Sequence, residues 1–326
     1  MNYCPGCLRE GHTTYCGPCR RILFGGKKVD HILPFSRPDF DLAKLSQSGR
    51  LSISGIQVKH SLRLEGNRLS LTEEMGEYIL KPVPRGTYLN LSAVPANEHV
   101  TMQTASQVFK IKTAANALIF FSDGEMAYIT KRFDVTESGH RLLQEDFAQI
   151  MQRTQETHGR NYKYESSYED IAFHMKKHIG AYAIEAEKFF RLVLFNYLVS
   201  NGDAHLKNFS LQRNSEFGDY LLTPAYDLMN TSLHVPGESD TALKLFSGDY
   251  TTEAYEAGSK YTRADFYEFA LKIMAPPVKS RIDKILKEIV SHEEGIKDLI
   301  QRSFLPDDMK TLYLASLELR RERLLS

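Results

Sequence analysis

The sequence predicts an α+β protein with two lobes, the first rich in strands and the second helical, preceded by a small cysteine-bearing segment. Three observations support this. All four cysteines lie among the first nineteen of 326 residues. Short runs of alternating polar and apolar residues occupy 51–134, as expected for strands. After residue 136 apolar residues recur mainly at helical spacing, so the expected segments cover 1–30, 31–135 and 136–326.

The composition is that of an ordinary globular protein. Apolar residues make up 42% and charged residues 25% of the chain, and the formal net charge is zero. A zero net charge gives no electrostatic reason to expect nucleic-acid or membrane binding. The apolar runs are too short to span a bilayer, and the N-terminus lacks the pattern of a secretory signal. We therefore expect a cytoplasmic protein, in which paired cysteines more often bind metal than form disulfides.

The cysteines form two Cys-x-x-Cys pairs, Cys4 with Cys7 and Cys16 with Cys19. A two-residue spacing lets both thiolates of a pair point into one tetrahedral site, and the glycines permit the tight turns. Four thiolates close the coordination shell, so the expected metal is a structural Zn²⁺. Two disulfides or four free thiols are the alternatives, and His12, between the pairs, is expected to be a surface residue.

Alternating runs predict the strands of the first lobe. Residues 61–64 and 68–71 flank Gly66 and Asn67, which form a typical hairpin turn. The other expected strands cover residues 77–82, 116–121 and 127–133. This lobe is therefore expected to be a small antiparallel sheet with a helix inserted between its strands.

One charged residue, Lys81, lies in the otherwise apolar strand expected at 77–82. Glu98 follows in the first turn of a helix expected over 97–109. A strand lysine oriented by a helix glutamate can hold nucleotide phosphates, although the two residues could equally be unrelated surface charges. The segment before them, 51–59, has one glycine, Gly55, and is a weak phosphate loop by pattern.

The most informative segment is the polar loop at 201–208, which follows a long apolar helix expected from Glu185. Asp203 and Asn208 are five residues apart, as are the aspartate and asparagine of a protein-kinase catalytic loop. A carboxylate can accept a hydroxyl proton, and an amide oxygen suits Mg²⁺. Asp227, nineteen residues after Asn208, can supply a second metal ligand. The alternative is a turn with a structural histidine and a capping aspartate.

The order of these motifs resembles the HipA family. The segments that carry the resemblance are residues 52–59, 78–82, 97–99, 131–134, 144–147, 201–210 and 224–228. The resemblance implies a two-lobed protein-kinase-like fold with the ATP site between the lobes. It also implies a Mg²⁺- and ATP-dependent serine/threonine protein kinase that acts as the toxin of a bacterial toxin–antitoxin module. The better-known members phosphorylate aminoacyl-tRNA synthetases and so stall translation.

The resemblance assigns roles by position. Asp203 is the expected catalytic base, His205 and Lys207 are expected near the γ-phosphate, and Asn208 and Asp227 are the expected Mg²⁺ ligands. Adenine is expected to meet the backbone of the hinge at 131–133. The residues expected to bind the nucleotide are Ser54, Gly55, Lys59, Lys81, Glu98, Lys131, Phe133 and Tyr226.

The resemblance also implies self-control through the phosphate loop. Ser52 and Ser54 are the candidate autophosphorylation sites. A phosphoserine there would add nearly two negative charges beside the phosphate site and repel ATP.

About fifty residues precede the phosphate loop, a shorter segment than in HipA itself. This layout is similar to HipT, whose missing portion is a separate small protein. The expected partners are therefore a protein substrate, an antitoxin and such a small protein, with DNA reached only through the antitoxin. The cysteine pairs match neither family member.

Two other functions stay open. A small-molecule kinase would share the spacing of Asp203, Asn208 and Asp227, although the loop at 52–59 argues against it. A catalytically inactive regulator could bind DNA or an antitoxin through its zinc segment. The presence of Lys81 together with Asp203, Asn208 and Asp227 argues against an inactive regulator.

Overall fold

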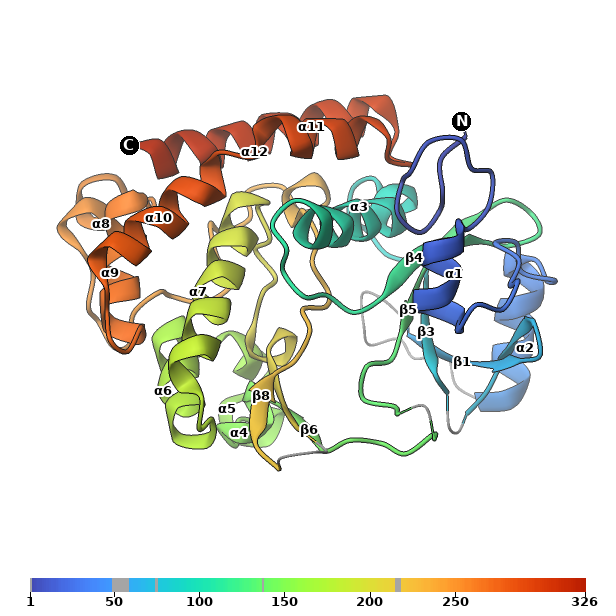
Figure 1. The fold of residues 1–326 in the computed structure, drawn as a ribbon, viewed down its shortest axis with the longest axis horizontal. Coiled ribbons are helices and arrows are strands. Elements are labelled where there is room, and N and C mark those ends of the chain that lie inside the picture. Colours follow the sequence, from blue (N-terminus) through green and yellow to red (C-terminus); the bar gives the residue numbers. More distant parts are fainter. Residues whose placement is uncertain (1, 49–58, 74–75, 137, 215–217) are drawn as a thin grey trace.

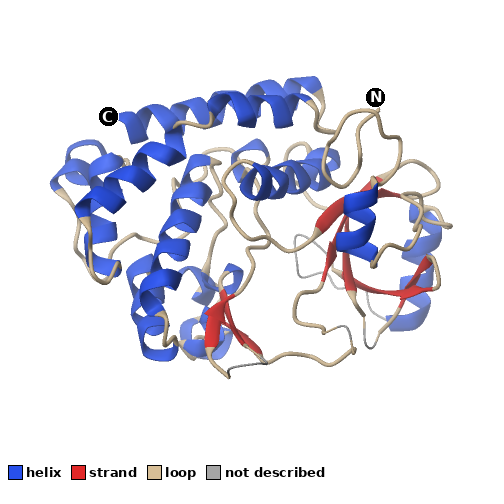
Figure 2. Ribbon diagram, in the orientation of Figure 1, coloured by secondary structure: helices blue, strands red, loops and turns tan. Residues whose placement is uncertain are grey.

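The computed structural model describes residues 2–48, 59–73, 76–136, 138–214 and 218–326. It confirms the predicted α+β arrangement, with a sheet at the N-terminal end and helices through most of the C-terminal part (Figures 1 and 2). Among these residues, no helix is both long enough and apolar enough to cross a bilayer.

Five antiparallel strands form the main sheet, in the order β2-β1-β3-β5-β4. Their bounds are β1 His60–Glu65, β2 Arg68–Leu71, β3 Tyr78–Pro82, β4 Asn116–Phe120 and β5 Met126–Lys131. The hairpin between β1 and β2 turns at Gly66, whose φ of 62° lies in the left-handed region that glycine adopts at little cost. All five predicted strands are therefore confirmed, within two residues at their ends.

Helix α3 (Val94–Gln107) packs against β4 and β5, and nearly every side chain along it is buried. The helix was expected to start at Asn97, which would have put Glu98 in its first turn. That expectation was wrong, because the helix starts at Val94 with Pro95 in its first turn, where the missing N–H has no partner to lose. Glu98 consequently lies one turn inside the helix and faces the sheet.

The first residues of the chain share a hydrophobic core with the sheet. They contain two helices that the sequence analysis did not assign, α1 (Gly17–Phe24) and α2 (Arg37–Ser48). The Tyr15 hydroxyl donates to the carbonyl of Leu118 on β4 at 2.7 Å, and the Leu118 N–H donates to the carbonyl of Pro5 at 2.9 Å. The cysteine segment is thus attached to the edge strand of the sheet.

The C-terminal part is built mainly of helices around one large apolar core. Their bounds are α4 Phe147–Ile150, α5 Gln155–His158, α6 Tyr168–His178, α7 Tyr182–Leu198, α8 Glu253–Gly258, α9 Arg263–Ile273, α10 Lys279–Val290, α11 Glu293–Gln301 and α12 Asp307–Leu325. A second sheet joins β6 (Gln144–Asp146), β7 (Ser210–Arg213) and β8 (Tyr220–Leu222) in that order. It lies beside α4 to α7 in Figure 1.

The sequence of residues 145–153 also predicts a helix, and the first half of this prediction is wrong. Residues 144–146 form β6, and Asp146 then begins the short helix α4 by accepting a hydrogen bond from the N–H of Gln149 at 2.9 Å. Pairing of Gln144 with Gln212 across the sheet holds this segment extended. Local composition favours a helix there, but the strand is selected by a partner almost seventy residues away in the sequence.

Ser167 and Asp170, at the start of a helix that the sequence predicts over 167–178, match the pattern of a capping box, and this box is present at the start of α6. Ser167 Oγ accepts from the Asp170 N–H at 3.0 Å, and the Asp170 carboxylate accepts from the Ser167 N–H at 3.1 Å. We expect Ser167→Ala to lower the free energy of unfolding by about 1 kcal/mol, because loss of the cap leaves the N–H of Asp170 unpaired. Urea denaturation measures this. Ser280→Ala, at an exposed position of α10, should change stability by less than about 0.5 kcal/mol. An equal effect of both substitutions would contradict the capping argument.

Candidate active site

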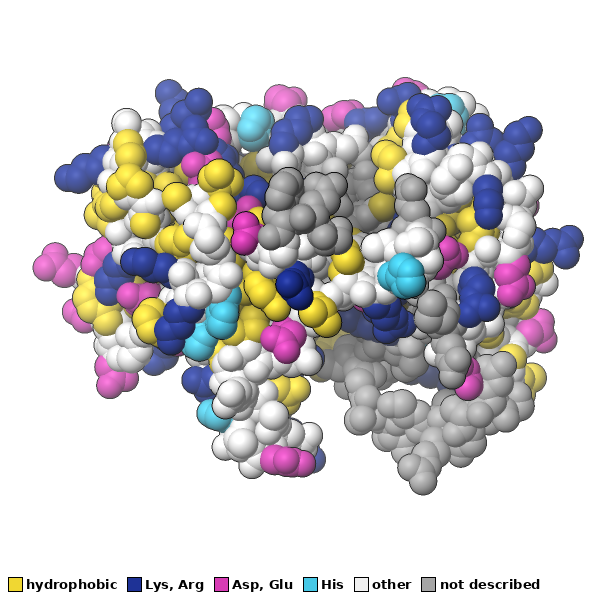
Figure 3. All heavy atoms as spheres, turned by 60° about the horizontal axis from the view of Figure 1, so that its bottom comes forward, with side chains coloured by type: hydrophobic (Ala, Val, Ile, Leu, Met, Phe, Trp, Pro, Cys, Tyr) yellow, Lys and Arg dark blue, Asp and Glu magenta, His cyan; other side chains and the backbone are white. Residues whose placement is uncertain are grey.

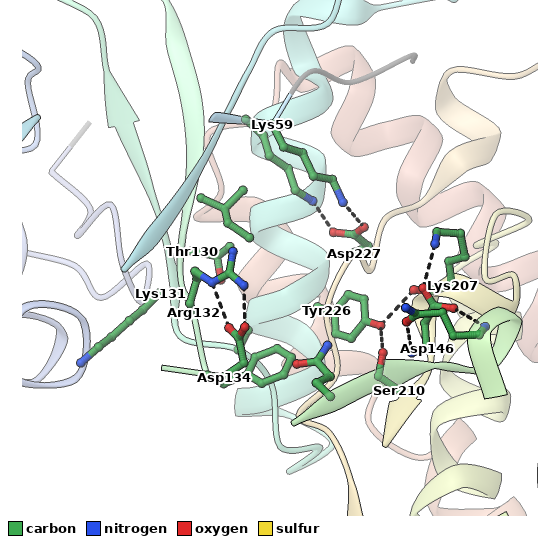
Figure 4. Close-up of a pocket in the computed structure, with 16 residues that line it drawn as sticks. Lys59, Thr130, Lys131, Arg132, Asp134, Asp146, Lys207, Ser210, Tyr226 and Asp227 are labelled. Atoms are coloured by element: carbon green, nitrogen blue, oxygen red, sulfur yellow. Dashed lines mark hydrogen bonds and ion pairs between the residues drawn. The ribbon is translucent and has the colours of Figure 1, made fainter. Parts of the chain in front are cut away.

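Four of the predicted site residues form one ionic cluster where the main sheet meets the C-terminal part. Lys81, on β3, is 1% exposed, and its ammonium donates to Glu98 Oε1 at 2.5 Å and to Asp227 Oδ1. Lys59 donates to the other oxygen of Asp227 at 2.8 Å (Figure 4). A buried ammonium is tolerated only when carboxylates replace its water shell, and two carboxylates do so here.

This pairing keeps Lys81 and Asp227 ionised, whereas burial raises the pKa of Glu98. Burial acts to lower the pKa of Lys81, but Asp227 and Glu98 together raise it above its ordinary value. Burial acts to raise the pKa of Asp227, but Lys81 and Lys59 hold it well below its ordinary value. The backbone of Asp227 has a φ of 55°, in the left-handed region that few non-glycine residues adopt. Such conformations concentrate at functional sites.

A cavity of about 250 Å³ opens beside this cluster. Its walls come from both parts of the chain, as Figure 4 shows. The lining residues are Lys59, Ile79, Lys81, Ala114, Thr130, Lys131, Arg132, Phe133, Asp134, Gln144, Asp146, Gln149, Lys207, Ser210, Tyr226 and Asp227. Apolar and aromatic side chains therefore line the cavity together with several charged ones. Charges of both signs are mixed over the face seen in Figure 3, in keeping with the zero net charge of the chain.

Two of the lining residues are aromatic. Phe133 and Tyr226 lie 5.8 Å apart between ring centroids. The Tyr226 hydroxyl donates to the carbonyl of Lys207 at 2.9 Å and accepts from Ser210 Oγ at 2.5 Å, so two hydrogen bonds fix the hydroxyl end of the ring. Burial raises the pKa of Tyr226, which keeps the phenol neutral. The side chain of Lys131 points away from the cavity in Figure 4, so Lys131 contributes backbone.

The polar loop at 201–208 connects α7 to β7 and is held by hydrogen bonds to its backbone. The N–H of Asp203 donates to Asn201 Oδ1 at 3.2 Å, and the N–H of Gly202 donates to Thr231 Oγ1 at 2.8 Å. The Tyr168 hydroxyl donates to the carbonyl of Ala204 at 3.0 Å. The loop is thus fixed in place before any ligand binds.

The functional side chains of this loop point in different directions. Asp203 is 48% exposed and lies 3.8 Å from His205 Nε2, and neither residue lines the cavity. Lys207 does line it and donates to Asp146 Oδ2 at 2.8 Å. The amide oxygen of Asn208 is buried and has no hydrogen-bond partner among the described residues. A buried carbonyl left unpaired is costly, so it suits a ligand such as a cation.

Burial shifts the pKa of two groups around the loop. It lowers the pKa of His205 to about 4, against the opposing effect of Asp203, so the imidazole is neutral at pH 7. It raises the pKa of Glu238 to about 7, although the hydrogen bond from Thr231 acts in the other direction. The Glu238 side chain packs against the backbone of Gly202, immediately before Asp203.

The four cysteine sulfurs converge on one point. All lie within 4.8 Å of one another, with Cys4 and Cys19 at 3.8 Å and Cys7 and Cys16 at 3.6 Å. These distances exclude the disulfide alternative, since a disulfide requires about 2.05 Å. Four sulfurs at the usual Zn–S distance of about 2.3 Å around a tetrahedral Zn²⁺ lie about 3.8 Å apart. His12 is not part of the group.

The two pairs differ in local structure. Glycine turns were expected in both, but the second pair uses the start of a helix. Cys16 is the N-cap of α1, and Cys19 lies within its first turn. Gly6 is required for close packing, because a Cβ there would lie 2.7 Å from Cys19 Sγ.

Several residues near the site were missed by the sequence analysis. Asp146 belongs to a segment that carried the family resemblance, but no role was assigned to it. Tyr164 and Glu238 had no sequence signal, because each reaches the loop from a distant segment. Ser52, Ser54 and Gly55 lie outside the described residues.

Known proteins are similar in sequence to this chain. The model of a family described as "HipA-like C-terminal domain" matches residues 51–294. A Haemophilus influenzae protein named "Putative kinase" is 28% identical over 94% of this chain and 92% of its own length. The Sinorhizobium fredii protein "Putative kinase Y4dM" is 31% identical over 60% of this chain, and the match spans about half of that protein (49%).

Solved structures share the fold. A chain of the Shewanella oneidensis MR-1 toxin–antitoxin complex of HipA, HipB and operator DNA superposes with a TM-score of 0.65 and 19% identity. That match covers 90% of this chain and 73% of the other. The Helicobacter pylori proinflammatory kinase CtkA has a TM-score of 0.50 and 16% identity, covering 80% and 92%. These likenesses confirm the predicted kinase-like fold.

The buried neutral His205 predicts a pH dependence of folding. Between pH 6.5 and about 4 the unfolded chain binds a proton at this residue and the folded chain does not, so stability falls as the pH decreases through this window. The loss should approach about 3 kcal/mol near pH 4. Denaturant unfolding at several pH values measures it. His205→Asn should make this part of the profile less steep, with a remaining slope from His99, whose pKa burial also lowers to about 4, whereas His140→Asn, at an exposed position, should leave it unchanged. Parallel profiles for His205→Asn and the parent chain would contradict the prediction.

Proposed function

This chain belongs to the HipA-like C-terminal domain family, and on that premise we propose that it is a Mg²⁺- and ATP-dependent serine/threonine protein kinase. The observation that carries the proposal is the cluster of Lys81 with Glu98 and Asp227 at the wall of a cavity. Kinases hold the α- and β-phosphates of ATP with a strand lysine that a helix glutamate orients. The 2.5 Å contact to Glu98 supplies that orientation here.

The aromatic lining of the cavity suits adenine. Its aromatic rings, Phe133 and Tyr226, offer flat surfaces, and the segment 131–133 offers backbone. The N–H groups of Lys131 and Arg132 already donate to the carbonyls of Ala115 and Glu77, both at 2.8 Å. An adenine bound at this segment would therefore use the N–H of Phe133.

The residues present also fit Mg²⁺. Asn208 offers a buried, unpaired amide oxygen and Asp227 offers an ionised carboxylate, both of which are ligands this cation prefers. Each oxygen of Asp227 accepts from one lysine in the structure, and each keeps a second lone pair that a cation could use. Bound Mg²⁺ would neutralise phosphate charge.

Asp203 is suited to act on a protein substrate. Its carboxylate is half-exposed, so a side chain on a large substrate can reach it. In the proposed reaction, Asp203 accepts the proton of a serine or threonine hydroxyl while the hydroxyl oxygen bonds to the γ-phosphorus. The bond from that phosphorus to the bridging oxygen breaks, and ADP leaves with the electron pair.

We extend the proposal to the biology that the family implies. The chain would be the toxin of a bacterial toxin–antitoxin module, closest in layout to HipT, with a translation component such as an aminoacyl-tRNA synthetase as substrate. The S. oneidensis neighbour assembles with an antitoxin and operator DNA, which supports an antitoxin partner here. Autophosphorylation at Ser52 or Ser54 would regulate the enzyme. The lobes would be 31–135 and 136–326.

The cysteine cluster would hold a structural Zn²⁺ that stabilises the position of α3, the helix that carries Glu98. The carbonyl of Gly6 accepts from His99 Nε2 at 2.9 Å, and the carbonyl of Cys7 accepts from Gln107 Nε2 at 2.9 Å. Both donors lie on α3, and His99 is the residue after Glu98. A metal that fixes the first cysteine pair would therefore also fix the helix that orients Lys81.

The kinase assignment predicts the behaviour of Asp203→Asn. The purified chain with Mg²⁺ and γ-labelled ATP should transfer phosphate to serine, and mass spectrometry should locate it at Ser52, Ser54 or an added protein. Asp203→Asn should reduce the rate by at least about 100-fold, because the amide cannot accept the proton. Asp219→Asn, at an exposed position, should retain the parent rate. Since a fully phosphorylated sample would also be inactive, the starting protein must first be shown to be unmodified. Unmodified protein that neither binds nor uses ATP would refute the assignment.

The zinc assignment predicts one Zn²⁺ per chain by elemental analysis. Removal of the Zn²⁺ with a strong chelator should lower the thermal midpoint by on the order of 5–10 °C, since the core shared by the cysteine segment and the main sheet loses its cross-link. Re-addition of Zn²⁺ should restore it. Cys19→Ser should bind less metal and show no chelator effect. A protein with no bound metal and unchanged stability in chelator would leave four free thiols as the correct reading.

A further inference from the structure

A tyrosine hydroxyl is hydrogen-bonded to the carboxylate of the proposed catalytic base. The phenol of Tyr164 donates a hydrogen bond to Asp203 Oδ1. The Tyr164 ring also packs edge-on against His205 of the same loop, with centroids 5.1 Å apart and planes at 76°. The ammonium of Lys163 lies 4.9 Å from the centroid of the Tyr164 ring. The ring is thus held by the loop, and its hydroxyl is directed at the base.

The backbone that carries Tyr164 is fixed. Tyr164 ends a 3-10 turn, Tyr162–Tyr164, and its N–H donates to the carbonyl of Asn161 at 2.8 Å. Three residues later, the capping box of Ser167 begins α6. The Tyr164 residue is 36% exposed, so rotation of its side chain toward solvent opens no cavity in the core. The hydroxyl can therefore leave Asp203 while the chain around it stays in place.

The substrate hydroxyl that receives the phosphate must donate a hydrogen bond to Asp203, as the Tyr164 hydroxyl does. In general base catalysis the substrate O–H donates to the carboxylate that will take its proton, within ordinary hydrogen-bond distance. A phenol O–H is chemically the same kind of donor, and it is present at every moment at high effective concentration. The two hydroxyls therefore compete for Asp203.

We propose that Tyr164 is a resident occupant of the acceptor site, which a substrate serine or threonine hydroxyl must displace before phosphate is transferred. The inference rests on the proposed function, because it requires Asp203 to be the base. Tyr164 then raises the concentration of acceptor needed for half-maximal rate without taking part in the transfer. It acts as a selectivity filter, since only acceptors that bind well through other contacts compensate for the displaced hydrogen bond.

The test is Tyr164→Phe, which removes the hydroxyl and keeps the ring against His205. Initial rates are measured with saturating Mg²⁺ and γ-labelled ATP and with increasing dephosphorylated casein as the acceptor protein. We expect the KM for casein to fall by roughly 10-fold, the effect of one hydrogen bond to a charged group, with kcat within about twofold of the parent. The affinity for ATP should not change. Tyr162→Phe, the same deletion in the same turn, should match the parent chain.

Other outcomes overturn the inference. A lower kcat with an unchanged KM would make Tyr164 a positioning residue, and unchanged constants would make its contact irrelevant. Phosphate found on Tyr164 itself would make it an acceptor. Each of these results requires transfer by the parent chain and loss of transfer in Asp203→Asn, so the proposed function would survive. If no variant transfers phosphate and Asp203→Asn behaves as the parent, the inference fails together with the proposed function.

Discussion

The ammonium of Lys81 is the group on which the arrangement of the site depends. It is buried, so it must be paired, and its two carboxylate partners come from different parts of the chain. Glu98 belongs to α3 behind the sheet, and Asp227 belongs to the C-terminal part. One charge therefore fixes a strand, a helix and a loop relative to one another. The cost of leaving a charge buried and unpaired, roughly 3–5 kcal/mol, opposes any arrangement in which one partner is absent.

The cysteine segment also holds α3, the helix that carries Glu98, through hydrogen bonds. Backbone carbonyls of the first cysteine pair accept hydrogen bonds from two side chains of the helix, and the carbonyl of Leu8 accepts from Arg302 at 3.1 Å. The segment therefore contacts the sheet, the helix and the C-terminal part together. A structural metal at this point would act on the site through packing, since the sulfurs lie in the core behind the sheet and not in the cavity.

The polar loop at 201–208 shows why a spacing rule identifies residues but not their surroundings. The five-residue interval from Asp203 to Asn208 was visible in the sequence, and the structure adds what each side chain contacts. The amide oxygen of Asn208 is buried and has no hydrogen-bond partner among the described residues. Lys207 forms an ion pair with Asp146, and Asp203 accepts a hydrogen bond from the hydroxyl of Tyr164. Asp146 precedes its partner Lys207 by 61 residues and Tyr164 precedes Asp203 by 39, so no local pattern could associate them with the loop.

The sequence by itself determined the strands of the main sheet, the capping box at Ser167 and the identity of the charged residues, because these depend on local periodicity and on side-chain chemistry. It did not determine where α3 starts or that residues 144–146 form a strand, because pairing and packing override local preference there. Only the tertiary structure decided that Lys81 meets Asp227, 146 residues away, and that the four sulfurs converge. Such contacts arise when the sheet and helices close around a common core, and their geometry belongs to that packing and not to any one segment.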